Sequence, residues 1–161
     1  MESIARSHFW YLGGSPARTS VVLGDARLSL EREPPQHFDV LVVDAFISDS
    51  IPIHLLTRQA FALYWRHLKP DGVLAVHVSN KFVDLAPIVA EAAAETGKTA
   101  RLLHNDLDWK NGVAQSSWML VTSRTGLFER PLLWNGRAVA LPPTLHPWTD
   151  DYSSIWSVLK L

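Results

Sequence analysis

Cysteine is absent from the sequence, and three kinds of chemistry are excluded with it. Without thiols the chain cannot form disulfides, thiolate metal sites or a cysteine nucleophile, and this composition fits a reducing compartment. We therefore expect a cytoplasmic protein. Metal-ligand patterns are lacking too, because the seven histidines include no HExxH pair or other metal-ligand spacing. No metal is predicted.

Excess charge and long apolar runs are also missing. The net charge of −1 gives no overall basic field, so neither nucleic acid nor an anionic membrane is a predicted partner. No apolar run approaches the roughly 20 residues that cross a bilayer. The first residues lack the basic and apolar regions of a signal peptide. The serines include no G-x-S-x-G motif, so no nucleophile elbow is predicted.

What remains is the composition of an ordinary globular domain. The chain has 161 residues, of which 47% are hydrophobic and 19% charged. This length and balance predict one domain, residues 1–161, with a core of its own.

Apolar periodicity predicts strands that alternate with helices. Val-rich runs indicate strands, and apolar residues at steps of three and four indicate helices. A Pro-Asp-Gly turn is expected at 70–72, before one of the strands. The predicted strands are 19–25, 38–46, 73–79, 99–105 and 116–123, and the predicted helices are 26–33, 56–68, 85–96 and a terminal one within 148–161.

This alternation is typical of an α/β domain with a mainly parallel sheet, and the run 38–46 has the pattern of a strand covered on both faces. In such sheets ligands bind beyond the carboxyl ends of the strands. Gly24 and Asp25 end one predicted strand, and Asp44 ends another. These positions are therefore the first candidates for a functional site.

Gly24 and Asp25 have two interpretations. Glycine permits a sharp turn or a close approach to a ligand, and an aspartate beside it can accept hydrogen bonds from an exocyclic amine or a ribose hydroxyl. Alternatively, Asp25 is the N-cap of the helix that begins near Ala26.

Asp44 and Asp49 form the stronger candidate, in the segment VVDAFISDSIP. At the rim of the sheet, partial desolvation would make Asp44 a better base. Two acids there would attract a cationic substrate and could take a proton from an ammonium. The alternative is that Asp49 or Ser50 caps the next helix, with Pro52 in its first turn.

His54 and the TDDYSS segment are two further positions of interest. His54, just past this loop, is the histidine that we single out for a possible functional role. Asp150 and Asp151 in TDDYSS are most simply the acidic N-terminus of the terminal helix.

Four segments together resemble the spermidine synthase-like (polyamine aminopropyltransferase) family. They are VVLGDARLSLE, FDVLVVDAFISDSIPIHLLT, LKPDGVLAVHVSN and TDDYSS, and the resemblance covers about residues 15–161. It implies the Rossmann-like class I S-adenosylmethionine-dependent methyltransferase fold, a three-layer α/β/α architecture. It also implies aminopropyl transfer from decarboxylated S-adenosylmethionine to a diamine such as putrescine, with methylthioadenosine as product and no metal.

The resemblance also implies roles for individual residues. Gly24, Asp25 and Ala26 would lie against the adenine. Asp44, followed by Ala45, matches the aspartate that begins the gatekeeping loop and helps to deprotonate the attacking amine. Asp49 resembles the second aspartate of that loop, and Pro52 would close it near the adenine.

The sequence departs from the family pattern in two respects. The family loop usually reads aspartate, two small residues, aspartate and proline, whereas Asp49 is five residues after Asp44 here. The family's first strands and its glycine-rich loop would precede Met1. Because missing strands leave unpaired sheet edges, we expect a homodimer or larger assembly that uses those edges.

Two other functions remain open at this stage. One is a non-catalytic remnant or assembly module of the same fold. The other is a small-molecule S-adenosylmethionine-dependent methyltransferase.

Overall fold

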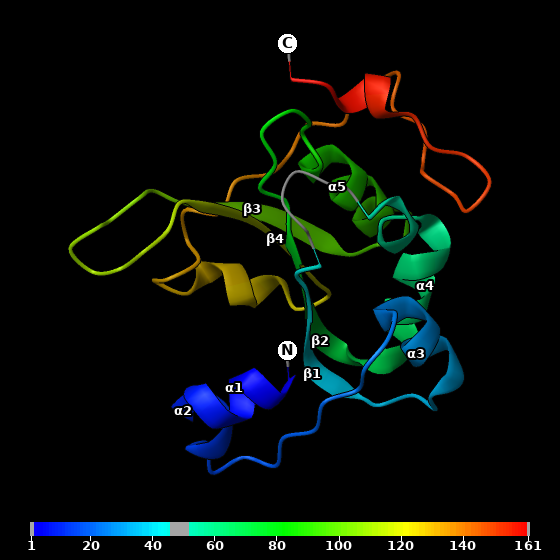
Figure 1. The fold of residues 1–161 in the computed structure, drawn as a ribbon. Coiled ribbons are helices and arrows are strands. Elements are labelled where there is room, and N and C mark those ends of the chain that lie inside the picture. Colours follow the sequence, from blue (N-terminus) through cyan, green and yellow to red (C-terminus); the bar gives the residue numbers. More distant parts are fainter. Residues whose placement is uncertain (1, 46–51, 161) are drawn as a thin grey trace.

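The computed structural model describes residues 2–45 and 52–160. Its helices and strands are short and follow one another along the chain (Figure 1). The helices are α1 (Glu2–His8), α2 (Trp10–Gly13), α3 (Ala26–Arg32), α4 (Arg58–His67) and α5 (Ala86–Glu95), with 3-10 helices η1 (Ile53–Leu55), η2 (Thr125–Glu129) and η3 (Ile155–Val158). The strands are β1 (Phe38–Val43), β2 (Leu68–His77), β3 (Thr99–Asn105) and β4 (Ser116–Thr122).

The strands form one sheet in the order β1-β2-β4-β3. β1 and β2 are parallel, whereas β4 is antiparallel to both β2 and β3. The α/β class is thus confirmed, but the described sheet is mixed and not mainly parallel. Because β1 and β2 are parallel, their carboxyl ends, at Val43 and His77, meet at one edge of the sheet.

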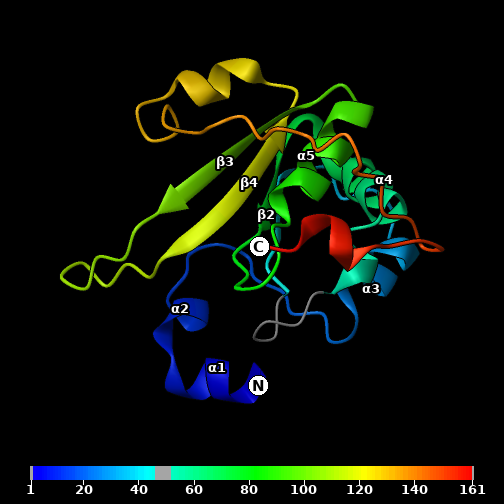
Figure 2. The ribbon, with the colours of Figure 1, turned by 90° about the horizontal axis from the view of Figure 1, so that it is seen from above.

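The core lies between the sheet and the helices. In Figures 1 and 2, α3, α4 and α5 lie on one side of the sheet, with α1, α2 and η2 on the other. Leu74 and Val76 of β2 point toward the helices and are fully buried, as are Met119 and Val121 of β4. These alternate positions pair across the sheet and bury one continuous face.

The opposite face is covered less evenly. Near β3, Arg101 lies over the Phe128 ring, so η2 covers this part of the sheet. On β1, in contrast, Val40 and Val42 are 56% and 55% exposed. The Val-rich sequence of this strand predicted cover on both faces, but the structure covers only one.

Local signals explain where the helices begin. The Asp25 side chain accepts a hydrogen bond from the Leu28 N–H, and Thr57 accepts one from the Ala60 N–H, so both residues are N-caps. Asp84 accepts from the Ala86 N–H at the start of α5. Gly97, with φ of +65°, follows the end of this helix.

Three predicted elements differ in the structure. Residues 19–25 form no strand, because no described strand pairs with them and they lie on the surface. Residues 70–72 lie within β2, where the register to β1 shifts between Phe38 and Val40. The C-terminal segment contains only the short η3, because several of its backbone groups bond to other segments, as the Trp148 and Val158 carbonyls do to Arg58 and Asp84.

No helix in the described ranges is both long enough and apolar enough to cross a membrane.

Candidate functional site

Asp44 follows β1 directly, and its side chain faces the end of β2. The parallel register pairs Val42 with Ala75 and Val43 with Val76, so the next pair along the strands is Asp44 and His77. Asp44 Oδ1 and His77 Nδ1 are 2.8 Å apart. The Asp44 side chain is 54% exposed, so the partial burial expected from the sequence is not found. The Asp44 carboxylate is instead held by its contact with the His77 imidazole.

His77 extends this contact to β4. Its Nε2 lies 2.7 Å from Ser79 Oγ, and the Ser117 N–H donates to the same hydroxyl oxygen at 2.7 Å. The His77 ring also stacks on Trp118, with 4.8 Å between ring centroids. The imidazole is therefore held in position by three neighbours.

Asp25 takes part in a second assembly, in which it both caps α3 and meets His54. Its Oδ1 accepts the Leu28 N–H at 2.9 Å, and its Oδ2 lies 3.1 Å from His54 Nε2. The hydrogen bond from Leu28, with that from His54, lowers the pKa of Asp25. Both interpretations of Asp25 thus remain open, since an N-cap can still face a ligand.

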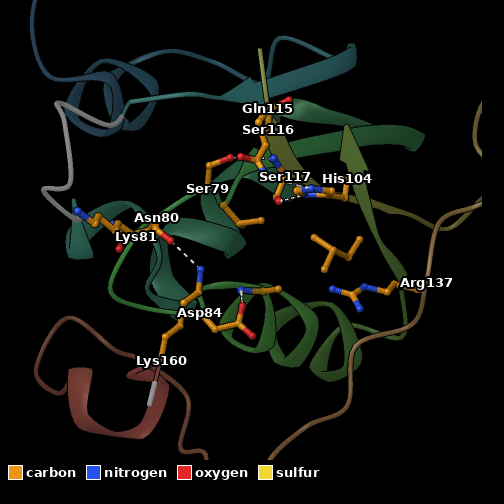
Figure 3. A pocket seen from close by; sticks show the side chains of 13 residues that line it. Ser79, Asn80, Lys81, Asp84, His104, Gln115, Ser116, Ser117, Arg137 and Lys160 are labelled. Atoms are coloured by element: carbon orange, nitrogen blue, oxygen red, sulfur yellow. Dashed lines mark hydrogen bonds between the residues drawn. The ribbon is translucent and has the colours of Figure 1, made fainter. Parts of the chain in front are cut away.

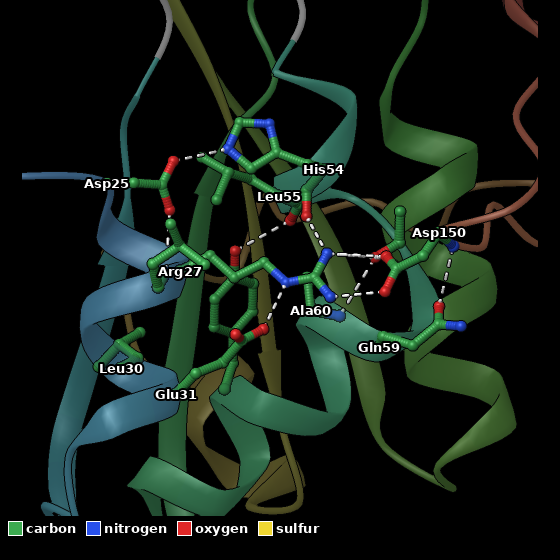
Figure 4. A network of polar contacts seen from close by, with 12 residues as sticks. Asp25, Arg27, Leu30, Glu31, His54, Leu55, Gln59, Ala60 and Asp150 are labelled. Atoms are coloured by element: carbon green, nitrogen blue, oxygen red, sulfur yellow. Dashed lines mark hydrogen bonds and ion pairs between the residues drawn. The ribbon is translucent and has the colours of Figure 1, made fainter.

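Arg27, the second residue of α3, joins this region to the C-terminal segment (Figure 4). Its guanidinium donates to both Asp150 oxygens, at 2.7 and 2.6 Å, and to the His54 carbonyl at 2.8 Å. The Thr57 hydroxyl donates to Asp150 Oδ1 at 2.7 Å. The hydrogen bonds from Arg27 and Thr57 hold the pKa of Asp150 at about 2. Asp150 is therefore a structural ion-pair partner and not the helix N-terminus expected from the sequence.

Two pockets accompany these assemblies. One, of about 530 Å³, is lined by Pro52, His54, Thr57, Asp150 and Tyr152, among others. The other, of about 430 Å³, has Ser79 on its wall (Figure 3). Both volumes lie within the usual range for small-molecule sites.

The residues predicted from the sequence therefore lie in separate parts of the structure. Pro52 and His54 line one pocket, and Asp25 contacts His54. Gly24 (φ +132°) and Ala26 flank Asp25 on the surface, and Ala45 is exposed after Asp44. Asp49 lies outside the described residues. Among the described side chains, no hydrogen bond or ion pair joins Asp44 to Asp25.

Sequence reasoning missed the partners of these aspartates. No local motif marks His77, although its place at the end of a strand adjacent to β1 could have indicated a contact with Asp44. Ser79 belongs to no sequence motif that would have indicated a function. Arg27 and Asp150 are 123 residues apart, and no local pattern connects them.

A metal site was not predicted. Within residues 2–45 and 52–160, no group of three or more His, Cys, Asp or Glu side chains is arranged to hold a metal ion.

No protein-family model and no curated protein sequence matches this chain. Solved structures do. A spermidine synthase from Thermotoga maritima matches 75% of this chain, with a TM-score of 0.53 and 15% identity. A spermidine synthase in complex with the transition state analogue AdoDATO matches 75%, with a TM-score of 0.52 and 15% identity. A probable spermidine synthase from Corynebacterium glutamicum ATCC 13032 matches 77%, with a TM-score of 0.53 and 21% identity.

The matched region is 41%, 40% and 44% of these three synthases, so this chain spans about two fifths of their length. At these identities the likeness concerns the fold. The chain has a spermidine synthase-like α/β fold.

Proposed function

We propose that the protein contributes to aminopropyl transfer from decarboxylated S-adenosylmethionine to a diamine such as putrescine. One observation carries the proposal: within a spermidine synthase-like fold, the exposed carboxylate of Asp44 follows β1 and is fixed by His77. The carboxyl end of a strand is where α/β sheets bind their ligands. We place this activity in the cytoplasm.

The pocket beside His54 is compatible with the nucleoside part of such a co-substrate. Its volume of about 530 Å³ is sufficient, and Pro52 and Tyr152 offer apolar surface for a base. Each carboxylate oxygen of Asp25 has a second lone pair that can accept from an exocyclic amine. A methyl group built on Gly24 would meet only Ser29 Oγ, at 3.9 Å, so a ligand can approach the backbone there. In this proposal Gly24, Asp25, Ala26 and Pro52 contact the adenosine, Ala45 lies beside Asp44, and Asp49, outside the described residues, is a second acid for the amine.

The chemical role of Asp44 follows from its two oxygens. Oδ1 accepts from His77, which leaves Oδ2 to accept a proton from the ammonium of the diamine. The neutral amine nitrogen then attacks the methylene carbon bonded to the sulfonium. A C–N bond forms, the C–S bond breaks, and methylthioadenosine leaves. The carboxylate also attracts the cationic substrate.

The test combines binding and turnover. We expect calorimetry to detect methylthioadenosine binding, and mass spectrometry to detect spermidine formed from putrescine and decarboxylated S-adenosylmethionine. Asp44→Asn should lower turnover at least about 100-fold, because general-base catalysis typically contributes that much. Nucleoside affinity should stay nearly unchanged.

Asp39→Asn is the matched control, since Asp39 lies at the other end of β1 and pairs with Lys69. It should keep the parental turnover. The absence of binding at millimolar nucleoside would reject the enzyme proposal, and equal turnover in Asp44→Asn would remove Asp44 from the mechanism.

A second candidate function is assembly with another copy of this chain. It is favoured by the exposed valines of β1, an edge strand of the described sheet. Exposed apolar edges of this kind promote pairing between chains.

A further inference from the structure

Asp44, His77 and Ser79 form a continuous hydrogen-bonded chain. Asp44 Oδ1 lies 2.8 Å from His77 Nδ1, and His77 Nε2 lies 2.7 Å from Ser79 Oγ. An acid on one imidazole nitrogen and a hydroxyl on the other is the arrangement by which hydrolases activate a serine. Such a triad is recognised by the geometry of its three residues and not by their positions in the sequence.

The protons on this chain can be assigned from the partners. A carboxylate only accepts hydrogen bonds, so Nδ1 of His77 carries a proton and donates it to Asp44. In the neutral ring Nε2 is then an acceptor, and Ser79 donates its hydroxyl proton to it. The Ser117 N–H donates to Ser79 Oγ from the other side at 2.7 Å. His77 is therefore held in the tautomer that a general base requires.

Ser79 lines the pocket of about 430 Å³ shown in Figure 3, and the other charged side chains there indicate what the pocket accepts. Three are cations, on Lys81, Arg137 and Lys160, and the single carboxylate is that of Asp84. Asp84 already accepts from the Ala86 N–H. Lys160 uses one proton on the Asn80 carbonyl, at 2.6 Å, and retains two further donors.

Because the pocket is lined by three cations and one carboxylate, it repels a cationic polyamine and attracts an anionic ligand. In Figure 3 Ser79 lies at the upper part of the pocket, Arg137 at the right and Lys160 at the lower left. An elongated substrate can therefore present a carbonyl to Ser79 while its acidic end meets one of these cations.

We propose that Ser79 is the nucleophile of an acyl-transfer site whose substrates are esters or thioesters with a carboxylate on the acyl group. Ser79 Oγ bonds to the carbonyl carbon, and its proton moves to His77 Nε2. The C–O or C–S bond to the leaving group breaks, and that group departs with the proton from His77. Water then attacks the acyl-serine, gives its proton to Nε2, and releases the acid as Ser79 regains the proton.

A fluorophosphonate probe tests the nucleophile. Attack by Ser79 expels fluoride and forms a stable phosphonate ester, so we expect one adduct, located on Ser79 by tandem mass spectrometry. Ser79→Ala should abolish labelling, and Asp44→Asn should slow it at least about 100-fold, as expected for loss of general-base assistance. Ser123→Ala is the control, because Ser123 is exposed beyond β4 and should leave labelling unchanged. No adduct in the parental protein, or one on another residue, overturns the proposal whether or not the variants fold.

Two esters of matched length test the pocket. Mono-4-nitrophenyl glutarate should be hydrolysed with kcat/KM about tenfold or more above that of 4-nitrophenyl valerate, as expected from one charge-assisted contact. Arg137→Met or Lys160→Met should lower kcat/KM for the glutarate ester toward that for the valerate ester. Equal rates for both esters in the parental protein reject the acidic substrate class.

This site is distinct from the aminopropyltransferase proposal, although Asp44 belongs to both. Ser79→Ala discriminates between them. Failure of serine labelling alone leaves spermidine formation to be judged by its own assay, and failure of nucleoside binding alone leaves the serine site intact.

Discussion

Asp150 gains its low pKa from side chains far away in sequence. Arg27 donates to both carboxylate oxygens and Thr57 to one of them, and these hydrogen bonds are stronger when Asp150 is ionised. The pKa of about 2 in the folded protein compares with an ordinary value of 3.8. The ionised carboxylate therefore stabilises the folded state.

This shift predicts a specific acid sensitivity. The stabilisation is complete above the ordinary pKa of 3.8 and is lost as pH falls from there toward about 2. Asp150→Asn should reduce the free energy of unfolding near neutral pH, and its difference from the parental protein should shrink toward pH 2. Urea unfolding at several pH values measures this. A difference that is constant with pH, or one equal to that of the neighbouring Asp151→Asn, would contradict the assignment.

Thr57 offers a second test at the residue scale. It is buried, caps α4 through the Ala60 N–H, and donates to Asp150. Thr57→Ala should lower the free energy of unfolding by about 1–2 kcal/mol, the usual cost of a lost N-cap. Thr57→Ser keeps the hydroxyl and should cost clearly less. Equal losses in the two variants would indicate that the methyl group matters more than the cap.

At the scale of elements, sequence patterns were reliable where packing agreed with them. The helices after Asp25 and Thr57 and the strands β1, β3 and β4 form close to where periodicity and caps indicate. Residues 19–25 do not form the predicted strand, because a strand needs a neighbouring strand for its backbone hydrogen bonds. The apolar pattern of one segment does not show whether such a neighbour exists. Asp44 was recognised because it ends an apolar run. Its partner His77 lies 33 residues away, and only the register of β1 and β2 brings them together.

The C-terminal segment has little regular structure, and Trp148 is its most deeply buried side chain. Trp148 is 1% exposed in the core, and its carbonyl accepts the Arg58 N–H at 2.7 Å. Trp148→Ala should destabilise the fold by about 3–5 kcal/mol, as is typical for a buried aromatic residue.

Trp156 is the matched control, since it belongs to the same segment and is 85% exposed. Trp156→Ala should change stability by less than about 0.5 kcal/mol. Thermal and urea unfolding of both variants measure the contrast. Similar losses would mean that the segment is not held by Trp148.

At the scale of the whole molecule, helices cover the two faces of the sheet to different extents. Helices bury the central strands on one face, at Leu74, Val76, Met119 and Val121, while β1 leaves Val40 and Val42 exposed on the other. Such apolar surface on an edge strand favours association. We expect light scattering after size exclusion to show a dimer or larger assembly at micromolar concentration.

Val40→Lys and Val42→Lys should shift this equilibrium toward the monomer, because a charge on an edge strand opposes pairing. Val22→Lys is the control, since Val22 is exposed outside the sheet. A parental protein that is monomeric at micromolar concentration would contradict the prediction.

The pair between Arg27 and Asp150 also has a consequence for biosynthesis. At ordinary translation rates, about 6–25 seconds separate the synthesis of these two residues. During that interval α3 and α4 exist without the residues that join them to Trp148 and Asp150. The nascent chain therefore exposes apolar surface of α3 and α4 to chaperones until Trp148 and Asp150 have been made.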